Sequence, residues 1–196
     1  SLALGVDTAG QPRVTGLENL PHLLVAGMTG SGKSVFLGGL VLSLLLRPFP
    51  DDLRLVMLSN GVELIPYEGL PHLLGYFNGI ENWVPGNLWI PAWRTDGKHI
   101  LPMLRWLEAE RDRRLELLGA SGCASLATYN QRAAQQNERL LPRIVIFHEH
   151  FYVYGDAQNK YDWSPPEVPK LKEVDPIFTR LAQNGHAAGI HLLLTN

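Results

Sequence analysis

The eight residues 27–34, which read Gly-Met-Thr-Gly-Ser-Gly-Lys-Ser, constrain the fold of this chain more than any other segment. They fit the pattern G-x-x-x-x-G-K-[ST] and lie between an apolar run at residues 22–26 and a helical pattern at residues 33–46. Glycines let such a loop curl until its backbone N–H groups point inward at phosphate oxygens, and the following helix adds its positive dipole end. The segment therefore predicts a strand, a phosphate-binding loop and a helix, in that order.

The positions of this loop have distinct predicted parts in binding a nucleoside triphosphate. Lys33 would reach the β- and γ-phosphates and act in catalysis, whereas the Ser34 hydroxyl would coordinate Mg²⁺. The residues that we expect around the nucleotide are Gly27, Met28, Thr29, Gly30, Ser31, Gly32, Lys33, Ser34 and Val35.

The rest of the chain alternates short apolar runs with helical patterns. Strands are predicted at residues 22–26, 53–58, 143–147 and 190–195, and helices at residues 33–46, 100–118, 124–140 and 175–185. Short, almost wholly apolar strands suit a parallel sheet that is covered on both faces. The pattern predicts a layered α/β fold, with inserted loops near residues 78–93 and 155–171. The tryptophan-rich loop 78–93 is interpreted as a surface flap, with a stacking or partner surface as the alternative.

Composition narrows the class of protein further. A chain of 196 residues with 45% apolar residues can bury one core, so a single domain over residues 1–196 is expected. A net charge of −2 and a single cysteine, Cys123, argue against an extensive DNA-coating basic surface and against a disulfide framework. The charge and the single cysteine fit a protein of the reducing cytosol. No apolar run approaches the roughly 20 residues that span a bilayer, so no membrane contact is expected from this chain itself.

The predicted strand at residues 143–147 is followed by His148, Glu149 and His150. Motors with such a loop carry a second apolar strand that ends in a Mg²⁺-binding acid and then a glutamate that orients water. In this register Glu149 is the catalytic, water-orienting residue, and His148 stands in the place of the acid, where imidazole suits Mg²⁺ poorly. The alternative register puts Glu149 in the place of the acid, but a one-residue slip turns each side chain to the opposite face of a strand.

Several blocks of residues, taken together, resemble one family. The run Leu-Pro-His-Leu-Leu-Val-Ala-Gly-Met-Thr-Gly-Ser-Gly-Lys-Ser at 20–34 closely resembles the nucleotide loop of the FtsK/SpoIIIE double-stranded DNA translocases. Matching blocks follow in the same order, with Pro-His-Leu-Leu at 71–74, Glu-Arg-Asp-Arg-Arg at 110–114, Arg-Leu-Ala-Gln at 180–183 and Ala-Ala-Gly-Ile-His-Leu at 187–192.

The resemblance implies a three-layer, RecA-like P-loop motor domain that is truncated at its C-terminal end. It implies ATP and Mg²⁺ as ligands, double-stranded DNA as partner, a homo-hexameric ring, and ATP hydrolysis coupled to DNA movement in bacterial chromosome segregation. Such a motor works in the cytoplasm, and its full-length protein is commonly tethered to the inner membrane by a separate region.

Two alternatives stay open, the first of them because of departures from the family pattern. Ser-Asn-Gly at 59–61 replaces Asp-Pro-Lys, Asn184 and His186 replace a lysine and an arginine, and His148 replaces an aspartate. These changes suggest lost charges near the nucleotide. The first alternative is therefore a hydrolysis-deficient structural or regulatory module that still binds nucleotide. The second is a secretion or conjugation ATPase of the same superfamily.

Overall fold

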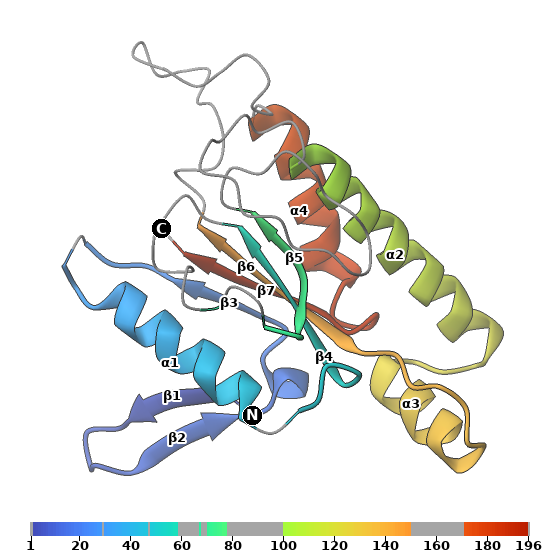
Figure 1. The fold of residues 1–196 in the computed structure, drawn as a ribbon, viewed down its shortest axis with the longest axis horizontal. Helices are drawn as coiled ribbons and strands as arrows, with labels where there is room; N and C mark the ends of the chain where they lie inside the picture. Colours follow the sequence, from blue (N-terminus) through green and yellow to red (C-terminus); the bar gives the residue numbers. More distant parts are fainter. Residues whose placement is uncertain are drawn as a thin grey trace.

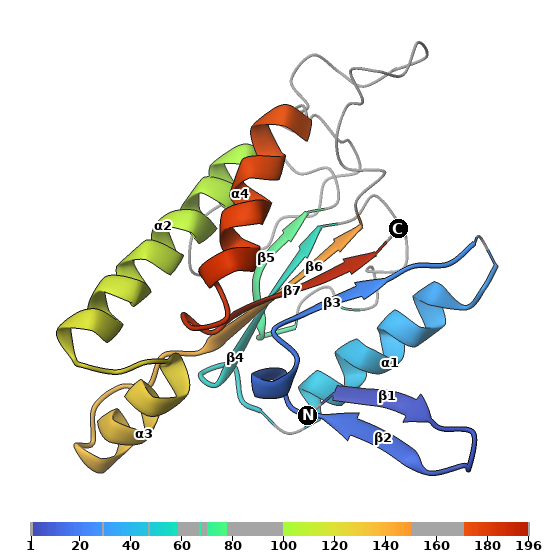
Figure 2. The ribbon, with the colours of Figure 1, turned by 180° about the vertical axis from the view of Figure 1, so that it is seen from behind.

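The computed structural model describes residues 2–28, 30–46, 48–58, 67, 70–77, 100–149 and 171–195. Five strands form a central sheet in the order β3-β7-β6-β4-β5, and every neighbouring pair is parallel (Figure 1). The strands are β3 (His22–Val25), β4 (Leu53–Leu58), β5 (Leu73–Phe77), β6 (Arg143–Glu149) and β7 (Ile190–Thr195). Helix α1 (Lys33–Leu45) covers one face, and α2 (Ile100–Ala120) and α4 (Leu171–Asn184) cover the other (Figures 1 and 2). The predicted three-layer α/β fold is confirmed.

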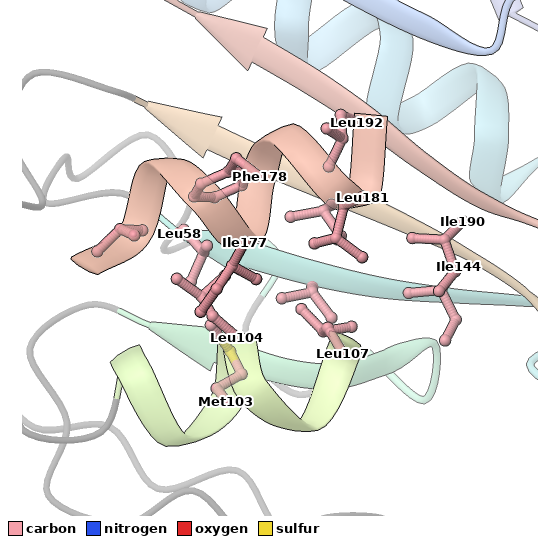
Figure 3. Packing of buried hydrophobic residues seen from close by; sticks show 13 residues of the cluster. Leu58, Met103, Leu104, Leu107, Ile144, Ile177, Phe178, Leu181, Ile190 and Leu192 are labelled. Atoms are coloured by element: carbon pink, nitrogen blue, oxygen red, sulfur yellow. The ribbon is translucent and has the colours of Figure 1, made fainter. Parts of the chain in front are cut away.

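The two faces of the sheet carry separate apolar clusters. Alternate residues of a strand point to opposite faces, so Ile144 and Ile146 of β6 face α2 and α4, while Val145 and Phe147 pack with α1. Figure 3 shows side chains of α2, α4 and the strands meeting in the first cluster. Apolar residues on both faces of β4, β6 and β7 explain why these strands read as continuous hydrophobic runs.

A hairpin precedes the sheet and was not predicted. Strands β1 (Leu2–Val6) and β2 (Pro12–Thr15) pair antiparallel, and a short helix η1 (Leu17–Asn19) leads into β3. The hairpin is attached to α1, because Leu2 is fully buried in the α1 cluster and Ser43 Oγ accepts a hydrogen bond from the Ala3 amide at 3.2 Å. Its turn is closed by Asp7, whose carboxylate accepts the amides of Ala9 and Gln11, each at 2.9 Å.

Helix ends differ from the predicted ones where specific caps intervene. The helix expected at 124–140 is α3 (Leu126–Gln135), which begins after Ser125, whose side chain accepts the Thr128 amide. It ends because Asn137 adopts a left-handed φ of 56° and the Glu138 amide then bonds the Ala133 carbonyl at 2.9 Å. Conversely, α4 begins at Leu171, within the predicted loop 155–171, and places Pro176 inside the helix. The loop 78–93 lies outside the described residues.

The histidines of the two Pro-His-Leu-Leu blocks have structural roles. His72 donates Nε2–H to the Pro48 carbonyl at 2.9 Å, and this block runs into the unpredicted strand β5. His22 donates Nε2–H to the Ala182 carbonyl at 2.8 Å, while its Nδ1 accepts the Leu192 amide at 3.1 Å. Since His22 accepts at one nitrogen and donates at the other, this geometry requires the neutral ring. Burial lowers the pKa of His22, in agreement with this.

Two further histidines lie beside His22 where β3 and β7 begin. His191 is buried and donates Nδ1–H to the Pro21 carbonyl at 3.2 Å, and its Nε2 has no hydrogen-bond partner among the described residues. Burial lowers the pKa of His191 to about 4, and the neighbouring His186 and Arg143 also disfavour its charged form. His186 is exposed and bonds the Glu18 carbonyl at 3.2 Å.

An arginine of α2 joins the starts of two other strands. The buried Arg114 donates to the carbonyls of Pro142, before β6, and Ala188, before β7, at 2.8 and 3.0 Å. It also bonds Glu110 at 2.7 Å, as does the exposed Arg113. Burial works against ionisation of Glu110, but hydrogen bonds from Arg113 and Arg114 outweigh it and lower the pKa of that carboxyl. Among the helices of the described ranges, none is both long and apolar enough to cross a membrane.

Candidate functional site

The side chain of Lys33 bridges the described part of the loop between β3 and α1. Lys33, the first residue of α1, donates from Nζ to the carbonyls of Gly27 and Met28, at 2.5 and 3.1 Å. These bonds turn the lysine side chain back over the loop that precedes it. Ser34 and Val35 follow in the first turn of α1, where both are exposed, and Thr29 lies outside the described residues.

Glycines shape this loop in two ways. A Cβ at Gly27 would lie 2.6 Å from Ser31 Oγ, so the Ser31 side chain would have to move away. Gly32 caps α1 with a left-handed φ of 90°, a conformation that L side chains rarely adopt. The first amides of an α-helix lack intrahelical acceptors, so the start of α1 next to these glycines suits an anionic group.

We expect Gly32→Ala to weaken nucleotide binding roughly 5- to 30-fold, because a Cβ costs about 1–2 kcal/mol in the left-handed conformation. Isothermal titration calorimetry with an ATP analogue measures the change. The matched control is Gly39→Ala in the same helix, where a Cβ meets no atom within 4 Å and should leave binding unchanged. Equal loss of affinity in both variants would contradict a specific requirement at Gly32.

The end of β6 differs from the first interpretation of its sequence. His148 belongs to the face of Ile144 and Ile146, is 1% exposed, and stacks on Phe178 of α4 with ring centroids 4.6 Å apart. It therefore lies on the face away from α1 and does not occupy a position for Mg²⁺ beside the nucleotide loop. Position 149 comes two residues after Phe147, the same interval that separates Val145 and Phe147 on the α1 face of β6.

Position 149 and the nucleotide loop are close neighbours at the edge where the parallel strands end. Glu149 pairs with Thr195 of β7, and Thr195 pairs with Val25, the last residue of β3. Adjacent strands lie about 4.8 Å apart, so the backbones at 149 and 25 are roughly 10 Å apart. The sheet thus brings the backbone of an acidic residue close to the strand end that leads into the loop.

Other departures from the family pattern lie elsewhere. Asn184 ends α4, and His186 bonds the Glu18 carbonyl before β3, so both belong to the edge where the strands begin, opposite the nucleotide loop. The expectation that these two changes remove charge beside the nucleotide was wrong within this chain. Residues 59–61 and His150 lie outside the described residues.

Comparison with known proteins identifies the family of this chain. The model of the FtsK/SpoIIIE family matches residues 1–171. The chain belongs to the FtsK/SpoIIIE family. It is similar to the DNA translocase FtsK of Pseudomonas putida, with 36% identity over 99% of this chain, and to that of Pseudomonas aeruginosa, with 35% identity over 98%. The chain spans 23% of the length of each of these relatives.

Solved structures of P-loop ATPases share the fold of this FtsK/SpoIIIE domain. The cytoplasmic domain of the type VII secretion ATPase EccC of Thermomonospora curvata is 25% identical, with a TM-score of 0.67 over 98% of this chain and 21% of that chain. The pCW3 conjugation coupling protein TcpA, in a monomer form with ATPγS, is 24% identical with a TM-score of 0.69 over 99% of this chain and 47% of its own. At that identity the likeness shows the fold alone.

Proposed function

We propose that this chain is the ATP-hydrolysing motor domain of a double-stranded DNA translocase. The observation that carries the proposal is the nucleotide loop with Lys33 at its end, separated from the acidic position 149 by a single strand. Membership of the FtsK/SpoIIIE family and similarity to named DNA translocases support duplex DNA as the partner. A homo-hexameric ring that works in the cytoplasm is proposed on the same grounds.

The loop residues would hold the nucleotide. Backbone amides between Gly27 and Ser34, with the start of α1, would bind the phosphates, and Lys33 would place its ammonium against the β- and γ-phosphates. The Ser34 hydroxyl is the proposed loop ligand of Mg²⁺. When bound, Mg²⁺ neutralises charge on the phosphate oxygens.

Glu149 would supply the carboxylate opposite this loop. The alternation along β6 favours Glu149 over His148 as the residue that serves the nucleotide, either by holding a Mg²⁺-bound water or by orienting the attacking water. Because His148 packs in the core, it no longer supports the hydrolysis-deficient alternative. Relatives that are named DNA translocases favour a duplex-DNA motor over a secretion or conjugation ATPase.

A net charge of −2 is compatible with this function. In a ring, a few Lys or Arg residues that face the pore are multiplied by the number of subunits, so a single subunit needs no extensive basic surface. A preference for duplex over single-stranded DNA in a binding assay would support the translocase. The opposite preference would support a conjugation ATPase.

The test is steady-state ATP hydrolysis, with and without long double-stranded DNA. We expect wild-type hydrolysis to rise with DNA, and Lys33→Ala and Glu149→Gln to lower it by at least about 100-fold, since each removes a charge that acts on the reacting phosphate or water. Glu149→Gln should still bind ATP, because the loop is intact. Wild-type protein that binds ATP without hydrolysing it would overturn the motor and favour a nucleotide-binding module.

A further inference from the structure

The ring of His148 occupies an unusual place in the sheet. It is the penultimate residue of β6 and lies between Leu58 of β4 and Leu194 of β7 in the ladder. On the side that faces α4, its ring stacks on Phe178, with an interplanar angle of 7°. The other two residues that β6 places on this face, Ile144 and Ile146, are aliphatic.

An aliphatic side chain could fill this space, but it would not stack on the ring of Phe178. The planar ring adds a directional contact, because parallel aromatic rings hold one another in a restricted range of offsets and tilts. Phe178 is itself held in place, since α4 packs on α2 through the buried cluster and through an ion pair between Arg180 and Glu108. The stack therefore fastens the end of β6 to a fixed helix.

Glu149, the residue after His148, needs accurate placement because it is the proposed catalytic carboxylate. Position 149 follows His148 directly, and a displacement of about 1 Å at a catalytic group can cost on the order of 100-fold in rate. We propose that His148 is a positioning residue, which stacks on Phe178 so that the backbone at the end of β6 holds Glu149 in line with the nucleotide loop. This inference rests on the first of the two roles proposed for Glu149, that of holding a Mg²⁺-bound water.

The test compares three variants by two readouts. His148→Ala removes the stack, His148→Phe keeps an aromatic ring, and Ile146→Ala creates a cavity in the same cluster two residues earlier on the same strand. The first readout is the Mg²⁺ gain, defined as the ATP affinity with Mg²⁺ divided by the ATP affinity in EDTA, both measured by calorimetry. The second is kcat for ATP hydrolysis, and unfolding in urea confirms that each variant is folded.

We expect His148→Ala to lose most of the Mg²⁺ gain and to lower kcat on the order of 10-fold, while its ATP affinity in EDTA stays within about twofold of wild type. His148→Phe should restore both, and Ile146→Ala should keep the gain despite its lower stability. A full Mg²⁺ gain in His148→Ala, an equal loss in Ile146→Ala, or no gain in wild type would overturn the positioning role. Absence of hydrolysis in a wild type that shows the gain would overturn only the proposed motor function.

Discussion

Replacing Arg114 with methionine is expected to lower the free energy of unfolding by about 3–5 kcal/mol. The Arg114 side chain is 3% exposed, and its guanidinium group bonds the carbonyls before β6 and β7 as well as Glu110. Methionine fills much of the volume but leaves both carbonyls without this donor. Urea denaturation followed by tryptophan fluorescence would measure the loss.

The matched control is Arg113→Met, one residue away in α2. Arg113 bonds the same carboxylate, Glu110, but its side chain is 54% exposed, so we expect a loss of about 0–1 kcal/mol. If the two variants lost the same stability, the Glu110 ion pair would account for both, and the carbonyl bonds of Arg114 would contribute nothing measurable.

Acidification from pH 7 to pH 4 is expected to lower the free energy of unfolding by about 3 kcal/mol through His191. Its pKa is about 4 in the folded chain against the ordinary 6.5, so the unfolded chain binds more protons between these two values. The stability is therefore fully present above pH 6.5, falls as the pH drops towards 4, and levels off below. The depressed pKa of His22 acts in the same direction.

Urea denaturation at a series of pH values, on wild type and His191→Gln, isolates this contribution. The variant cannot titrate at position 191, so its stability should depend less steeply on pH between 4 and 6.5. His22, His186 and Arg143 face this position and remain in both proteins, so they cancel in the comparison. Curves of identical slope would exclude His191 as the source of acid sensitivity.

The sequence predicted four of the five strands described in the central sheet, because these runs depend on local patterns. The runs at residues 53–58 and 190–195 coincide with β4 and β7, and Gly30 and Gly32 of the loop adopt the left-handed φ that glycine favours. The role of His148 was misread because residues on both faces of β6 are apolar, so hydrophobicity alone does not tell which face α1 covers. The alternation of Ile144, Ile146 and His148 was the signal that grouped His148 with the core.

Long-range bonds gave no signal in the sequence. Arg114 bonds backbone carbonyls 28 and 74 residues away, and no residue type marks a carbonyl acceptor. The hairpin was missed for a related reason, since only its contact with α1 buries Leu2. Helix α4 begins at Leu171, four residues before the predicted start, so Pro176 lies inside the helix.

The residues at the two ends of the parallel strands have different roles. The nucleotide loop follows the end of β3 and Glu149 is the last residue of β6, whereas Arg114, His22 and His191 connect the strand beginnings. Strands of four to seven residues put these two ends roughly 13–23 Å apart. A protein engineer could therefore raise thermal tolerance by changing residues at the strand beginnings and leave turnover unaltered. Random mutagenesis should likewise yield heat-stable and slow variants at largely separate positions.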